Sequence, residues 1–205
     1  MNLLFKRSIL VSLIGFVILG FFTITITQRT ESDNHTKTYN IDATHSAVIF
    51  RAKHVRVSYN YGRFNDFSGS ISMDETDVSK SSIELEVKAA SVDTANSKRD
   101  QHLRSPDFFN AKQFPVITFK STKVSSKPGQ ENMLEVTGDF YLHGVKKSIT
   151  ADVEITGEGK SRKGEAMIGF ETTFTIKRSE YGMKFELNGI SDEIRITVSV
   201  EAINN

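Results

Sequence analysis

Apolar and polar residues alternate along most of the chain with a period of two, which is typical of β-strands. The pattern is clearest where Ile83, Leu85 and Val87 share one face and charged residues take the other. Such alternation gives each strand one buried face and one solvated face. The alternating runs predict eight strands, at residues 45–54, 63–74, 81–90, 115–125, 131–142, 145–158, 164–177 and 190–203.

Short connections join these runs, and residues 127–130 and 143–144 have the glycine-containing composition of hairpin turns. Eight antiparallel strands with short connections predict an all-β fold, either an up-and-down barrel or a sandwich. Several runs exceed the usual strand length of about five or six residues, which favours a tall barrel. A barrel of this size either packs solid or encloses one small ligand, and the same apolar residues would serve both arrangements.

Residues 97–115 interrupt the alternation. Ser97 is the expected N-cap of a short helix, with Asp100 in its first turn, where a carboxylate favours the helix dipole. About two helical turns are too short to be stable alone, so this segment must dock on the strands through Phe108, Phe109 and Phe114. We expect it to form a lid over a cavity, and a surface helix that plugs the barrel end is the alternative.

The N-terminus predicts a membrane segment. Lys6 and Arg7 precede an uncharged, mostly apolar run over residues 8–27, which is long enough to span a bilayer and lacks a small-residue cleavage site. We therefore expect an uncleaved signal anchor over residues 1–27, with a cleaved signal peptide as the alternative. Either one would export the domain to the periplasm or cell envelope. Residues 28–37 would be a flexible tether, and residues 38–205 the folded domain.

The amino-acid composition limits the partners and the kinds of site that the chain can have. The chain has 205 residues, a formal net charge of +1 and no cysteine. This argues against nucleic acid as the main partner and excludes disulfides, thiolate metal sites and a cysteine nucleophile. The histidines expected in the domain (His45, His54, His102 and His143) show no metal-ligand spacing and no carboxylate at a fixed local offset. We therefore predict no catalytic residues, no metal and no cofactor.

An ordered series of short motifs resembles the YceI-like family of lipid- and polyisoprenoid-binding proteins over about residues 38–203. The motifs are YNIDATHS (39–46), Phe50 and His54, GRF (62–64), RDQHL (99–103), DFF (107–109), FPVITF (114–119), VTGDFYLHGV (136–145), RSEYG (178–182) and EA (201–202). The resemblance implies a lipocalin-like, extended eight-stranded antiparallel barrel with one short inserted helix. It also implies an exported, non-enzymatic protein whose apolar pore holds a prenyl quinone or polyprenyl phosphate.

The expected site has two parts. Its pore would be lined by aromatic residues on the apolar strand faces and closed by two from the lid segment: Phe50, Phe67, Phe119, Phe140, Phe170 and Phe174, with Phe108 and Phe109. Its polar mouth would hold the lipid head through residues in loops or in the lid: Arg99, His102, Arg178 and Tyr181.

The expected partners are an isoprenoid lipid or quinone and, through the N-terminal segment, a membrane, while a homodimer is left open. Two other functions are alternatives. One is an enzyme acting on such a lipid, with its catalytic groups converging at one mouth: His45, Asp100, His102 and Arg178. The other is a packed barrel that serves as a structural or interaction domain of the cell envelope.

Overall fold

The computed structural model describes residues 35–204, and residues 34–205 form one compact unit. The apolar segment at residues 1–27, with its expected helix, lies outside the described residues. Between residues 35 and 204, no helix is both long enough and apolar enough to cross a membrane.

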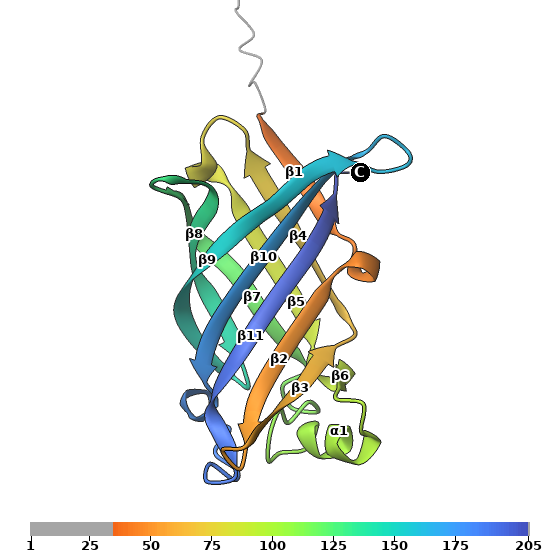
Figure 1. Cartoon of the computed structure of the whole chain (residues 1–205), viewed down its shortest axis with the longest axis vertical. Helices are drawn as coiled ribbons and strands as arrows, with labels where there is room; N and C mark the ends of the chain where they lie inside the picture. The colour runs from red at the N-terminus through yellow and green to blue at the C-terminus, as the bar shows by residue number, and fades with distance from the viewer. Residues whose placement is uncertain (1–34, 205) are drawn as a thin grey trace, which may run out of the picture. The chain divides into compact units, whose positions relative to one another are not determined.

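All the strands of the described residues join one antiparallel sheet (Figure 1). The strands are β1 Thr36–Ile41, β2 Ala47–His54, β3 Ser58–Phe64, β4 Phe67–Asp74, β5 Ser82–Lys88, β6 Val92–Asp93, β7 Val116–Lys127, β8 Gln130–Leu142, β9 Val145–Lys160, β10 Ala166–Lys177 and β11 Ile190–Ile203. Short breaks separate β1 from β2, β3 from β4 and β5 from β6. Each of these pairs continues along the same neighbours, so the sheet consists of eight long segments.

The sheet closes on itself through its first and last strands. β1 pairs with β4 on one side and with the end of β11 on the other, where Asn40 is opposite Ile203 and Ile41 is opposite Ala202. The fold is therefore a closed eight-stranded up-and-down barrel. This confirms the predicted barrel and rules out the sandwich, which has open sheet edges.

The predicted runs match the long strands of the second half of the barrel and miss parts of the first half. β1 was not predicted, because Tyr39 and Ile41 are its only large apolar residues. It begins at Thr36, inside the segment expected to be a tether. The run predicted at 45–54 begins with a short 3₁₀ turn, Ala43–His45, before β2.

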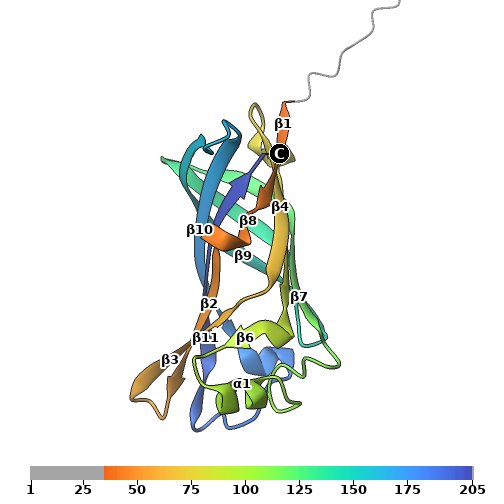
Figure 2. The ribbon, with the colours of Figure 1, turned by 90° about the vertical axis from the view of Figure 1, so that its right-hand side faces the viewer.

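One short helix, α1 (Ser97–Leu103), follows β6 and lies at one end of the barrel (Figure 2). Its N-cap is Asn96 and not Ser97, because the Asn96 side chain accepts a hydrogen bond from the amide of Arg99 at 3.0 Å. Asp100 is buried and accepts a 2.8 Å bond from the amide of Thr94. This bond ties the helix to the chain that follows β6. We call this end of the barrel the α1 end, and the other the β1 end.

The lid segment after α1 docks through its phenylalanines, as expected. Phe109 packs against Phe50 and Phe64, with ring centroids 6.1 and 5.4 Å away. Phe108 instead packs on His102, and Phe114 packs on His143 with ring centroids 4.7 Å apart. The lid is therefore fixed to opposite sides of the barrel end by aromatic contacts.

Candidate functional site

The barrel encloses a cavity of about 980 Å³, which we call the channel. Exposed residues of α1 and the β10–β11 loop, among them Lys98, Gln101 and Phe185, belong to its lining, so the channel reaches the surface at the α1 end. At the β1 end the interior is filled by buried side chains that do not line the channel: Tyr39, Val124, Leu134, Ile168 and Ala202. The channel is therefore open at one end and blind at the other.

The channel is long and narrow. Its lining follows β11 from Ile190 to Val200, about 33 Å along the strand at ~3.3 Å per residue, or roughly 25 Å along the barrel axis for a strand tilt of about 40°. Spread over this depth, the cavity volume corresponds to a width of about 7 Å, and non-bonded carbon atoms touch at ~3.5–4.0 Å. The channel is therefore much longer than it is wide, and it has room for an extended hydrocarbon chain.

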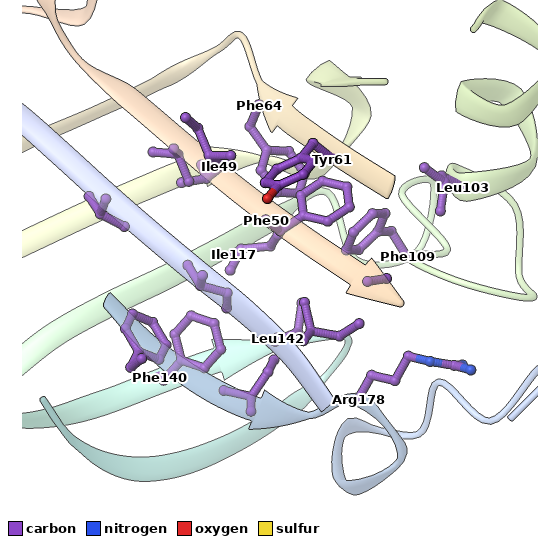
Figure 3. Close-up of a pocket in the computed structure, with 18 of the residues that line it drawn as sticks. Ile49, Phe50, Tyr61, Phe64, Leu103, Phe109, Ile117, Phe140, Leu142 and Arg178 are labelled. Atoms are coloured by element: carbon purple, nitrogen blue, oxygen red, sulfur yellow. The ribbon is translucent and has the colours of Figure 1, made fainter. Parts of the chain in front are cut away.

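Seven of the eight predicted pore residues line the channel: Phe50, Phe108, Phe109, Phe119, Phe140, Phe170 and Phe174. Figure 3 shows three of them, with Phe50 and Phe109 beside Phe64 and with Phe140 deeper in the barrel. The aliphatic part of the wall was not predicted as a site. The clearest sequence signal for this aliphatic wall is the even-numbered face of β11, where Ile194, Ile196 and Val198 all line the channel.

Phe67 does not line the channel. It is paired with Val87 at the start of β4 and belongs to the buried core. Its side chain is only 5% exposed, because neighbouring core residues cover it. Alternation correctly placed Phe67 on the inner face of its strand, but it could not tell a side chain that borders the void from one that other side chains cover.

Arg178 lies at the channel wall near the mouth, but its guanidinium is engaged by the protein. Its Nε, Nη1 and Nη2 atoms donate to the backbone carbonyls of Ser191, Met183 and Ile190 at 3.0, 2.8 and 2.9 Å. The residue is 2% exposed, and burial lowers the pKa of the guanidinium from its usual value. Arg178 therefore fastens the β10–β11 loop to the barrel, a role that the sequence did not suggest.

Arg99 and His102 both lie on α1 and line the channel mouth. Arg99 donates from Nε and Nη2 to the hydroxyl and carbonyl oxygens of Thr94, both at 2.7 Å, which directs the guanidinium along the mouth. The His102 ring is hydrogen-bonded through Nε2 to Asp107 at 2.8 Å and is half exposed. Both groups are in contact with water as well as with the channel.

Tyr181 lies behind the channel wall. It is 2% exposed and absent from the lining, and its ring packs edge-on against Phe140 with centroids 5.7 Å apart. Burial raises the pKa of its phenol. Its carbonyl is 2.9 Å from Nδ1 of His143, whose Nε2 is buried without a hydrogen-bond partner. Tyr181 and His143 therefore join the β8–β9 turn to the segment after β10.

The residues of the enzyme alternative do not converge. His102 and Arg178 line the channel, whereas His45 and Asp100 do not. His45 lies in the turn between β1 and β2, and Asp100 is bonded to Thr94.

His45 does have a carboxylate partner, contrary to the sequence-based expectation. Its Nδ1 is 2.8 Å from Oδ2 of Asp42 and 3.6 Å from Oε1 of Glu201. The hydrogen bond to Asp42 and the two negative charges raise the pKa of His45. The three side chains are close enough to bind a cation together, but Asp42 already accepts a hydrogen bond from the amide of Thr44. The trio therefore braces the junction between β1 and β11.

The family model described as the YceI-like domain matches residues 39–202, which run from within β1 to the last residues of β11. The chain belongs to the YceI-like family. This confirms the resemblance that the sequence motifs indicate over about residues 38–203. No catalytic family is indicated by this match.

Relatives within the YceI-like family cover most of the chain. A UPF0312 protein from Pseudomonas aeruginosa is 38% identical over 167 residues, which is 80% of this chain and 86% of the relative. The crystal structure of the Campylobacter jejuni YceI protein is 34% identical, has a TM-score of 0.67, and covers 75% of this chain and 90% of that chain.

A second structure is described as a polyisoprenoid-binding domain from Saccharophagus degradans, implicated in plant cell wall breakdown. It has a TM-score of 0.62 at 19% identity and covers 82% of this chain and 98% of that one. At this identity the likeness concerns the fold alone. The closed sheet of the described residues lies wholly within residues 34–205, which form one compact unit.

Proposed function

We propose that this YceI-like protein is an exported lipid-binding protein that holds one polyisoprenoid chain in its channel, for sequestration or transport. The observation that carries the proposal is the channel itself, which is apolar along its length, about 7 Å wide and closed at one end. The description of the Saccharophagus domain as polyisoprenoid-binding supports the same class of ligand.

The energetics favour a long apolar chain. Each buried methylene contributes about 0.8 kcal/mol, so three isoprene units contribute roughly 12 kcal/mol and, after an association cost of at least about 4 kcal/mol, approach the roughly 8 kcal/mol of a micromolar complex. A chain of this kind needs no polar partner inside the barrel. Among the described residues, the polar side chains in the lining include Asn60, Thr94, Asn96, Lys98 and Arg99, and these gather at the α1 end.

We place the lipid head at this polar mouth, because a phosphate or quinone oxygen is costly to bury without a donor. Arg99 is the stronger of the two arginine candidates. It is anchored by Thr94 and still in contact with water, whereas Arg178 has each of its nitrogens bonded to a carbonyl. His102 stands beside Arg99 as a second donor, and Tyr181 is too far behind the wall to take part.

Export and membrane attachment are part of the proposal and rest on the sequence. The apolar run at residues 8–27, preceded by Lys6 and Arg7, would anchor the chain and leave the barrel outside the cytoplasm.

Organic extraction of purified, unboiled protein followed by mass spectrometry tests the proposal directly, together with titration of the barrel with farnesol. We expect a prenyl lipid in the extract and micromolar binding of farnesol. Ala151 faces the channel on β9, so Ala151→Trp should fill it and weaken farnesol binding by at least about 100-fold while the barrel stays folded by circular dichroism.

Ser148→Trp is the matched control, because Ser148 lies on the outer face of the same strand and is exposed. It should bind farnesol like the parent. A clean extract and no binding of farnesol or prenyl quinones by the parent would refute the proposed function.

A further inference from the structure

The large exposed apolar side chains of the described residues are concentrated in one part of the barrel. All seven lie in β2, in β3, in the turn between them or in the β10–β11 loop: Ile49, Val55, Val57, Tyr59, Tyr61, Phe185 and Leu187. Four of them, Val55, Val57, Phe185 and Leu187, stand on the two turns at the α1 end. We call these four the mouth ridge.

The two turns form one surface. The amide of Val55 donates to the carbonyl of Gly189 at 2.7 Å, and His54 pairs with Ile190 across the same junction. The two turns lie side by side at the lower end of the barrel in both Figure 1 and Figure 2. They also border the channel, because His54, Phe185 and Ile190 belong to its lining.

The ridge keeps apolar residues where neither stability nor solubility favours them. Val57 is 81% exposed, and Val55 is 53% exposed with a φ of +41°, a conformation that is strained for a β-branched residue and natural for glycine. Strain of this kind persists when the rest of the structure holds it in place, and it gathers at functional sites. The mouth ridge therefore has the properties of a surface that is buried against a partner when the protein functions.

The charges around the ridge identify its partner. Lys53, Arg56 and Lys184 flank the four apolar side chains, and Glu186 is the one carboxylate among them. None of the three cations lies in an ion pair with any described residue. Apolar tips flanked by unpaired cations are the pattern of a surface that lies on a bilayer containing anionic lipids. Tyr59 and Tyr61, next along β3, suit the interfacial layer of such a bilayer.

We propose that the mouth ridge docks on an anionic lipid bilayer and sets the open end of the channel against it. The inference builds on the proposed function, because docking there would let a prenyl chain pass between bilayer and channel without crossing water. Docking itself depends only on the ridge, so the two ideas can fail separately.

The chain contains no tryptophan, so one introduced tryptophan is a unique fluorescent probe. The barrel of residues 34–205 is used, since the N-terminal segment could bind vesicles by itself. We expect Val57→Trp emission to shift to the blue with phosphatidylcholine vesicles containing about 30% phosphatidylglycerol, and much less with phosphatidylcholine alone. Gln130→Trp, exposed at the β1 end, is the matched control and should not shift.

Variants without tryptophan test the same surface by vesicle co-sedimentation. Val57→Glu combined with Leu187→Glu should lower partitioning by at least about 100-fold, and Arg56→Gln with Lys184→Gln, neither of which lines the channel, by about 10-fold on anionic vesicles only. Farnesol binding in the absence of vesicles should stay at the parent level in all of them.

The docking proposal is overturned if the emission of the Val57→Trp variant does not shift, or if the emission of the Gln130→Trp control shifts equally. It is also overturned if the glutamate variants change the sedimentation coefficient of the barrel and not its partitioning, because the ridge would then bind a second copy. Farnesol binding without vesicle binding would refute docking and leave the proposed function standing, and the reverse result would refute the function alone.

Discussion

The two ends of this barrel are built from one continuous antiparallel ladder, yet they are filled differently. At the β1 end, side chains such as Val124 and Ala202 are at most 1% exposed and leave no void. At the α1 end, Phe50, Phe64 and Phe109 line the wall of a channel that opens to solvent. Apolar residues occupy the inner faces at both ends, so apolar character alone does not decide which end is hollow.

The difference follows from where the strands break. The breaks between β1 and β2, β3 and β4, and β5 and β6 leave the ring closed by β1 at one end, while β2, β3 and β6 continue it at the other. Figure 2 shows the β2–β3 hairpin turning away from the barrel beyond this point. Gly62 leaves space here for the Phe50 ring, because a Cβ atom would lie 2.3 Å from Cζ of Phe50. The first three segments of the ring are therefore interrupted between the two ends, whereas the other five run through as single strands.

The largest effect is expected at the open end, from Arg178→Met. The change removes three charge-assisted hydrogen bonds to buried carbonyls, so we expect a loss of at least about 3 kcal/mol in the free energy of unfolding, measured in urea. Arg99→Met, on the partly exposed helix, should cost about 1 kcal/mol and should weaken binding of prenyl phosphates but not of quinones. Equal stability losses would show that Arg178 is not the anchor of its loop.

A pair of isoleucines compares the packed and hollow regions directly. Ile168→Ala removes a 3% exposed side chain from the packed end and should cost about 2–4 kcal/mol, because it opens a new void. Ile196→Ala removes a side chain that already borders the channel, so we expect about 1 kcal/mol. Urea unfolding of both variants measures the difference. Losses of the same size would mean that the channel is packed in solution.

The smallest effect concerns His45 at the junction of β1 and β11. Its pKa is raised above the ordinary value of about 6.5, so its contribution to stability is complete below pH ~6.5 and lost as the pH rises through the raised value. The hydrogen bond from His45 lowers the pKa of Asp42, whose contribution is lost as the pH falls below about 4. Melting curves of the parent and of His45→Gln over this range should diverge most between these limits. Parallel curves would mean that the pair is not formed.

Sequence periodicity predicted the long strands of the barrel well, and for a physical reason. Apolar and polar residues alternate along the long strands β8 to β11, and each of these strands pairs with its neighbour in the sequence. The pattern and the pairing therefore agree. β1 was missed because its partner β11 lies at the far end of the sequence. A short strand with two large apolar residues carries too little signal without that partner.

The site was predicted in outline only. Alternation identified five channel residues, because facing inward is a property of one strand, and the interrupted segment supplied Phe108 and Phe109. Whether a polar side chain is free to bind a ligand depends on residues outside its own strand. For this reason the prediction of Arg178 as a head-group residue did not account for its bonds within the protein. Its three carbonyl partners lie 5 to 13 residues away, in a loop whose path the sequence does not reveal. Likewise, the contact between His45 and Glu201 appears only once the register of β1 on β11 is known.

Because the channel is closed at the β1 end, its depth limits the length of hydrocarbon chain that the barrel can bury. A hydrocarbon chain that enters at the α1 end can advance only until its tip meets the side chains packed around Ile168 and Val124. Up to that depth each added methylene contributes about 0.8 kcal/mol, and beyond it an added methylene stays outside and contributes nothing. Affinity should therefore rise with chain length and then level off, and a ligand longer than the channel must leave its head group outside the mouth.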